Sequence, residues 1–418
     1  MTSAFSNGEI FAGRMPVLDR KGQLFGHSLY FRSVPTDGSC ESCGPDQNAA
    51  ALAGLVTGFG LKKLLGDKPG FISLDGNSVT CGFIRNLPKE ALIFEIPVED
   101  WKDEDLRREA AVLRQEGYHF CAPAQGLENL SGDVRNGLFE SVGNVRVNTK
   151  GKSVPELEKI AQVFSGRGVR LLADGVDTEE AFGRLKNAGY DFFQGLFFAS
   201  PPPIKTRRLE PRQAAVANLI RLIQANTDIQ EIEEEFKKVP ELTVALLKFI
   251  NSASIFTRSR ITSIRQTIAL IGYAKLLQWL LLLAYASPSG DRRSNPLFRL
   301  AAQRAKAMEI LSPLTRLGGE TLHPDEAFFI GLLSLLDVLF MAPIEDVLAE
   351  MNASEGVQAA ILRGEGIAGA LLELVRRTER NDFDGLKALL DKLGMGLTEV
   401  QTALISSFWW VECLNENE

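Results

Sequence analysis

Several acidic side chains end or follow apolar, β-rich runs and are the first candidates for chemistry. Asp75 ends the run FISLD, Glu95 lies in ALIFEIP, and Asp174 and Asp177 follow VRLL. Hydrolysis of a phosphodiester with divalent cations requires several carboxylate oxygens that converge on one or two ions, and Mg²⁺ tolerates little error in their geometry. These four carboxylates are candidates for such a reaction if the fold brings them to one place.

The stretch 169–203 predicts the element order strand, helix, strand. The strand VRLLA leads into Asp174, and Asp177 with Glu180 three residues later fits a capping box at a helix start. Gly189 is expected to end that helix in the left-handed conformation. The apolar run 192–198 is then a second strand, which the prolines at 201–203 stop.

Two signatures in this stretch resemble those of EAL domains, the bacterial phosphodiesterases of cyclic di-GMP. LLADGVDT is similar to the LLAEGVET signature, and GYDFFQGLFFASP is similar to the closing GYDxxQGYxFxxP segment. The resemblance implies a (β/α) barrel whose strand ends carry carboxylates that hold Mg²⁺ or Mn²⁺ over the dinucleotide. It matches Asp174 and Asp177 to the acids of the first signature and Gln194 to the closing glutamine.

The same resemblance indicates which ligands are changed. In the strand GHSLYFR the signature glutamate falls on Ser28, whereas Arg32 keeps the arginine that would contact a ligand phosphate. Glu95 keeps its glutamate. The other positions lose a ligand: an asparagine falls on Ser73, and an aspartate pair falls on Pro123 and Ala124.

Arg146 and Asn148 lie on one face of the predicted strand NVRVNT, because alternate residues of a strand point the same way. They match the family's lysine and aspartate. Arg146 keeps the charge but is a poor proton shuttle, since its guanidinium is always protonated, and Asn148 loses the anion. We therefore predict no catalytic residues, no bound metal and no cofactor. The groups that the chain retains are Arg32, Glu95, Arg146, Asp174, Asp177 and Gln194. They form either a remnant ligand site or a structural network in which Glu95 pairs with Arg32 or Arg146.

The second half of the chain has the apolar periodicity of helices. Three segments resemble HDOD domains: LLKFINSA, ITSIRQTIALIGYAKLLQWLLLLA and GLLSLLD. HDOD domains are helical relatives of the HD phosphohydrolases, and the resemblance implies a regulatory or protein-binding module. Where HD enzymes carry their His-Asp metal pair, this chain has Ser334 and Leu335. We predict a barrel domain at 9–203, a proline-bounded linker at 204–212 and the HDOD domain at 213–418.

Composition excludes several classes. The net charge is −7 and no long basic block is present, which argues against nucleic-acid binding. The most apolar run, 276–286, is shorter than the about 20 residues of a membrane span and predicts a buried helix. Five cysteines, with no signal peptide, predict reduced thiols in the cytoplasm, and the lone pair Cys40 and Cys43 predicts a flexible loop.

The fold class predicted from these observations is multidomain, an α/β barrel followed by an all-α domain. We predict a non-enzymatic bacterial signalling protein of cyclic di-GMP pathways that acts through protein partners, with a homodimer as one option. Two alternatives stay open. The barrel could bind cyclic di-GMP without cutting it, or Glu95, Asp174, Asp177 and Asp75 could support an altered metal-dependent hydrolysis.

Overall fold

The computed structural model describes residues 9–34, 41–58, 60–200, 211–225, 227–250, 263–285, 294–317 and 321–416. These residues fall into two compact units. The first comprises residues 1–200 together with Thr378–Lys387, and the second comprises residues 201–377 and 388–418.

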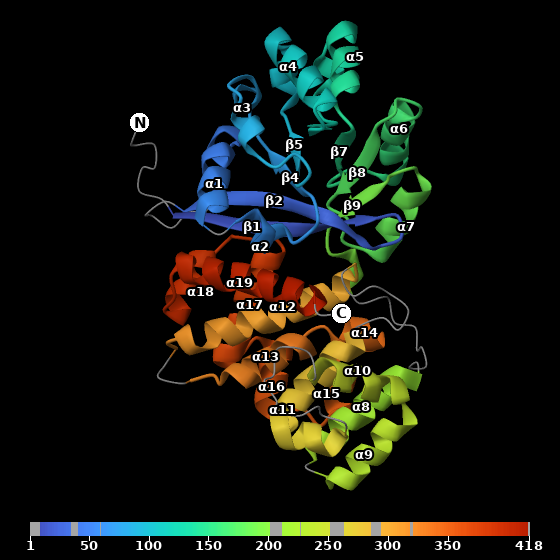
Figure 1. The fold of residues 1–418 in the computed structure, drawn as a ribbon, viewed down its shortest axis with the longest axis vertical. Coiled ribbons are helices and arrows are strands. Elements are labelled where there is room, and N and C mark those ends of the chain that lie inside the picture. The colour runs from blue at the N-terminus through green and yellow to red at the C-terminus, as the bar shows by residue number, and fades with distance from the viewer. Residues whose placement is uncertain are drawn as a thin grey trace. The chain divides into compact units, whose positions relative to one another are not determined.

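The first unit is built on a closed sheet (Figure 1). Its strands follow one another in the order β1-β9-β8-β7-β6-β5-β4-β2, and β1 also pairs with β2, so the described strands form a barrel. β1 is antiparallel to both neighbours, whereas the pairs from β2 to β9 around the rest of the ring are parallel. The strands are β1 (Glu9–Asp19), β2 (Leu24–Val34), β4 (Gly70–Ser73), β5 (Leu92–Glu95), β6 (His119–Pro123), β7 (Asn144–Asn148), β8 (Arg170–Asp174) and β9 (Phe192–Gln194), with the short β3 (Glu41–Ser42) on the outer edge of β2.

Helices follow the parallel strands, and short polar side chains begin most of them. They are α1 (Pro45–Gly58), α2 (Leu61–Leu65), α3 (Gly76–Thr80), α4 (Glu104–Gln115), α5 (Gly132–Ser141), α6 (Val154–Phe164) and α7 (Glu179–Asn187). The capping box predicted at Asp177 is wrong, because Thr178 caps α7 and accepts a hydrogen bond from the Ala181 amide at 3.2 Å. The stop predicted at Gly189 is confirmed by its φ of 102°. The strand predicted over 192–198 ends earlier, at Gln194.

The second unit contains helices and no strand among its described residues. They are α8 (Pro211–Gln224), α9 (Ile229–Lys238), α10 (Pro240–Ile250), α11 (Ile264–Tyr285), α12 (Pro296–Leu311), α13 (Pro324–Leu333), α14 (Leu336–Phe340), α15 (Ile344–Glu350), α16 (Glu355–Gln358), α17 (Gly366–Glu379), α18 (Leu386–Leu393) and α19 (Leu397–Glu416), of which α17 and α18 each have one end in the segment assigned to the first unit. α9 ends at Lys238 and α10 begins at Pro240, a residue that is tolerated in the first turn of a helix. Of the predicted linker, residues 204–210 lie outside the described residues, as does Cys40.

Helix α11 contains the apolar run that the sequence singles out. Among the described helices it alone is long and apolar enough to cross a membrane by those two criteria. Gly272, at φ 73° and ψ 171°, interrupts its helical backbone. Leu276, Leu280 and Tyr285 are buried, and the Tyr285 hydroxyl donates to the Leu332 carbonyl at 2.6 Å. The buried helix predicted for this run is therefore confirmed over its described residues.

Candidate functional site

The strand register of the barrel places the predicted site residues in one layer. Phe71, Ile93, Cys121, Leu172 and Phe192 form a buried cluster with Val17. Alternate residues of a strand share a face, so the side chains two positions further along each strand also point into the barrel. They form the next layer, which lies nearer the carboxyl ends of the strands. That layer contains Ser73, Glu95, Pro123, Asp174 and Gln194.

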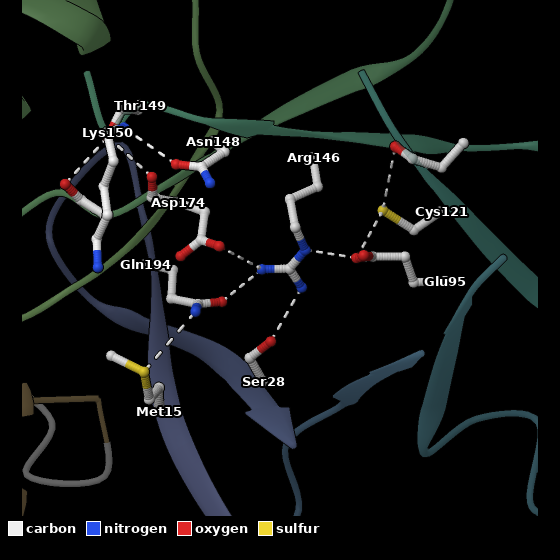
Figure 2. Close-up of polar contacts among 12 residues, drawn as sticks. Met15, Ser28, Glu95, Cys121, Arg146, Asn148, Thr149, Lys150, Asp174 and Gln194 are labelled. Atoms are coloured by element: carbon white, nitrogen blue, oxygen red, sulfur yellow. Dashed lines mark hydrogen bonds and ion pairs between the residues drawn. The ribbon is translucent and has the colours of Figure 1, made fainter. Parts of the chain in front are cut away.

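The guanidinium of Arg146, from β7, lies at the centre of this layer and contacts side chains from four other strands (Figure 2). Its Nε donates to Glu95 from β5. Nη1 donates to Gln194 Oε1 at 2.6 Å and lies 3.7 Å from Asp174 Oδ2, while Nη2 donates to Ser28 Oγ at 2.9 Å. Of the two pairings that the sequence left open for Glu95, the structure has the one with Arg146.

Burial and neighbouring charges shift the pKa values of the side chains in this cluster. The Arg146 and Glu95 side chains are 13% and 16% exposed. Burial lowers the pKa of Arg146, but the charges of Glu95 and Asp174 outweigh it and hold that pKa above its ordinary value. Burial raises the pKa of the Asp174 carboxyl, and the neighbouring Glu95 charge adds to the rise while Arg146 opposes it. Burial likewise raises the pKa of the Cys121 thiol, whose Sγ lies 3.8 Å from Glu95 Oε2.

The residues of this layer do not fit a divalent cation. Within the described part of the chain, no group of three or more His, Cys, Asp and Glu side chains is placed to hold a metal ion. Pro123 and Ala124 offer no side-chain oxygen, and the two carboxylates present, Glu95 and Asp174, both face Arg146. A guanidinium therefore occupies the centre on which carboxylate ligands of a metal would converge.

The other acidic candidates lie outside the cluster. Asp75 caps α3 and accepts from the Ser78 amide at 2.9 Å. Asp177 accepts from the Leu196 amide at 3.5 Å. Asn148 is exposed, and its Oδ1 accepts from the Lys150 amide at 3.0 Å. The structure thus brings together Glu95, Arg146, Asp174 and Gln194, and adds Ser28, which sequence reasoning had marked only as a lost ligand.

Arg32 contacts a segment from far along the chain instead of joining the cluster. Its Nε donates to Asn381 Oδ1 at 3.1 Å, and its guanidinium lies 5.3 Å from the centre of the Phe383 ring. Phe383 in turn packs edge-on against Phe11 of β1 at 5.0 Å between ring centres. All of these residues belong to the first unit, because that unit includes Thr378–Lys387. Sequence reasoning missed this contact because its partners are 349 positions apart.

In the second unit, Ser334, which the resemblance matches to one position of the HD metal pair, contacts an arginine. Arg304 Nη1 donates to Ser334 Oγ at 2.8 Å, and Ser334 Oγ donates to the Gly331 carbonyl at 2.7 Å. Burial raises the pKa of the nearby Asp337 carboxyl. His323 precedes α13 as its cap, and its Nδ1 accepts a hydrogen bond from the Asp325 amide at 3.3 Å.

Comparison with known proteins gives one family and several relatives. Residues 211–361 match the HDOD domain family. A Vibrio cholerae protein named cyclic di-GMP phosphodiesterase CdgJ is 28% identical, over 97% of this chain and 93% of its own. A Bacillus subtilis protein named uncharacterized protein YuxH is 23% identical, over 92% and 94%.

Solved structures of EAL proteins match the barrel region at low identity. Vibrio cholerae LapD, in an apo S helix-GGDEF-EAL structure, is 17% identical with a TM-score of 0.37, over 45% of this chain and 52% of that one. Bacillus subtilis YkuI, a protein with an EAL domain solved with cyclic di-GMP and calcium, is 15% identical with a TM-score of 0.36, over 60% and 69%.

The chain therefore combines a closed, mostly parallel barrel with an all-α region that contains an HDOD domain, which is the predicted fold class. The prediction that the chain is not an enzyme is wrong on this comparison, because the Vibrio cholerae relative, which matches along nearly the whole length, is named as a phosphodiesterase. That prediction rested on the number of carboxylate ligands that the barrel has lost. Such a number takes no account of the contacts that Arg146 makes with the carboxylates that remain.

Proposed function

We propose that the chain acts in cyclic di-GMP signalling by binding cyclic di-GMP at the carboxyl end of the barrel, where the Arg146 guanidinium supplies the positive charge. One observation carries the proposal: Arg146 lies where polar side chains from β2, β5, β8 and β9 meet. Ligands of parallel barrels bind at this end of the strands. A planar guanidinium also matches two phosphate oxygens at once.

A second cation is available for the second phosphate of the dinucleotide. Lys150 follows β7, is exposed and forms no ion pair with any described residue. Its charge and that of Arg146 both act on the Asp174 carboxyl, so both cations lie near that group. Two of the partners of Arg146, Ser28 and Gln194, are neutral, and a phosphate oxygen can replace either as acceptor without leaving a carboxylate unpaired.

Calorimetric titration of the full chain with cyclic di-GMP in a chelating buffer tests this proposal. We expect saturable binding that weakens about tenfold in Lys150→Gln and at least as much in Arg146→Met, because each removes a charge-assisted contact. Arg170→Met is the matched control, since Arg170 lies at the opposite, amino end of β8 and packs on Phe192. Absence of binding, or equal weakening in the control, would contradict the proposal.

Hydrolysis of cyclic di-GMP is the second candidate function, and the name of the Vibrio cholerae relative favours it. The carboxylates of the cluster, Glu95 and Asp174, are the groups on which such an activity would depend. Chromatography of the products after incubation with Mg²⁺ or Mn²⁺ tests it, with Glu95→Gln as the diagnostic variant. Product that forms equally in the wild type and in Glu95→Gln would not come from this site.

We also infer that the HDOD domain contributes protein contacts, including self-association, because Ser334 and Leu335 stand at the positions that the resemblance matches to the HD metal pair. Sedimentation velocity tests the self-association part. A single monomeric species across concentrations from about 1 μM to 1 mM, a range that spans the usual weak interfaces, would rule out the homodimer. A cytoplasmic location stays a prediction.

A further inference from the structure

A cavity of about 750 Å³ lies beside β7, between α5 and α6. None of the side chains that contact Arg146 lines this cavity, although Ala124 and Asn148, at positions matched to lost ligands, do; the cavity is therefore separate from the Arg146 cluster. Its size falls within the roughly 300–1,000 Å³ of small-molecule sites.

The body of the cavity is apolar. Phe139 of α5 and Phe164 of α6 meet edge to face in its lining, with 5.9 Å between ring centres. Aliphatic side chains complete this surface: Leu127, Val147, Ile160 and Val163. Val163 is 60% exposed. A ligand with an apolar body would remove this surface from water.

Three cations line the same cavity, although the chain as a whole has a net charge of −7. They are Arg135, Lys152 and Arg167, and none forms an ion pair with a residue that the structure describes. Arg167 lies over the Phe139 ring at 5.0 Å and donates from Nε to the Val163 carbonyl, which leaves its terminal nitrogens available. The one acid in the lining, Glu128, accepts from the Gly126 amide at 3.1 Å.

We propose that this cavity binds an amphipathic organic anion, a molecule with an apolar body and one terminal carboxylate, phosphate or sulfonate. The apolar body lies against Phe139, Phe164 and Val163, and the anionic group meets Arg135, Lys152 and Arg167. Guanidinium groups pair with such oxyanions through parallel hydrogen bonds. The site is distinct from the proposed cyclic di-GMP site and does not depend on it.

Titration of the full chain with decanoate tests the proposal, and two further probes separate its parts. We expect saturable binding of one decanoate per chain. Decanol, which has the same body without the charge, binds about tenfold more weakly because it loses the charge-assisted contacts. Guanosine monophosphate, an anion without an aliphatic body, does not compete. Absence of decanoate binding, or competition by the nucleotide at similar concentration, would overturn the proposal.

Variants locate the binding. Val163→Asp places a carboxylate in the apolar lining and abolishes decanoate binding, whereas Val112→Asp on α4, a valine that is 43% exposed and outside the cavity, leaves binding unchanged. Arg167→Gln weakens binding about tenfold and reduces its dependence on salt, because one screened ion pair is lost. Both aspartate variants alter an exposed residue, so helix content by circular dichroism serves as the folding check. Equal affinity in Val163→Asp and the wild type would overturn the assignment.

Discussion

Replacing Glu95 by glutamine tests the coupling at the centre of the barrel. Glutamine keeps the shape of the side chain but removes the charge that faces Arg146, and both side chains are less than a fifth exposed. Removing one partner of a buried ion pair costs about 3–5 kcal/mol. Asp174, Gln194 and Ser28 still contact the guanidinium, so we expect a loss of about 2 kcal/mol, nearer the cost of one hydrogen bond to a charged group.

Hydrogen exchange followed by mass spectrometry reports this loss locally. A change of about 2 kcal/mol raises the exchange rate of the amides in β5 and β7 roughly 30-fold when closing is faster than exchange. The double variant Glu95→Gln with Arg146→Met removes both charges and should be closer to the wild type than Glu95→Gln alone. Glu104→Gln is the control, because its pair with Arg108 is exposed and contributes little.

Two results would refute this reasoning. If Glu95→Gln leaves the exchange of β5 and β7 unchanged, the pair does not hold the layer together. If the double variant loses the sum of the two single losses, Glu95 and Arg146 are not coupled.

Three further perturbations follow from the same contacts. Burial raises the pKa of Asp174 in the folded state above its value in the unfolded chain. The folded protein therefore becomes more stable as the pH falls from the folded pKa toward the unfolded pKa. Asp174→Asn should remove that part of the pH dependence in thermal melts. Gly195→Ala should destabilise the barrel by more than about 2 kcal/mol in urea unfolding, since its φ is 149° and a Cβ would lie 1.9 Å from the Val176 carbonyl oxygen. Gly331→Ala should destabilise the helical unit by a similar amount, because the added Cβ would lie 2.6 Å from the backbone of α12. Gly183→Ala is the control: its Cβ would have no neighbouring atom within 4 Å, so this variant should not destabilise the protein.

The sequence predicted the barrel well because local signals and the family signatures agree. The alternation in NVRVNT predicted one face for Arg146 and Asn148, and the structure brings Arg146 but not Asn148 into the cluster, while Gly189 follows its helix with a positive φ. The pairing of Glu95 could be narrowed to two arginines but not decided. That choice depends on which guanidinium the closed barrel brings within reach, and closure is set by pairing of β1 with β2 and β9.

The errors have specific physical causes. Asp177 and Thr178 are both residue types that cap helices well. In the structure Thr178 caps α7, whereas the Asp177 carboxylate accepts a hydrogen bond from the amide of Leu196, which follows β9. Arg32 is paired with Asn381 because the chain returns to the first unit after most of the helical region, which no local pattern indicates.

A crystal structure of the full chain with cyclic di-GMP, grown in a chelating buffer, tests the central claim most directly. We predict a phosphate of the dinucleotide within about 3 Å of the Arg146 guanidinium, the distance of a charge-assisted hydrogen bond. A dinucleotide bound elsewhere on the chain, or one that appears only when Mn²⁺ is added and is held by that ion between Glu95 and Asp174, would contradict it.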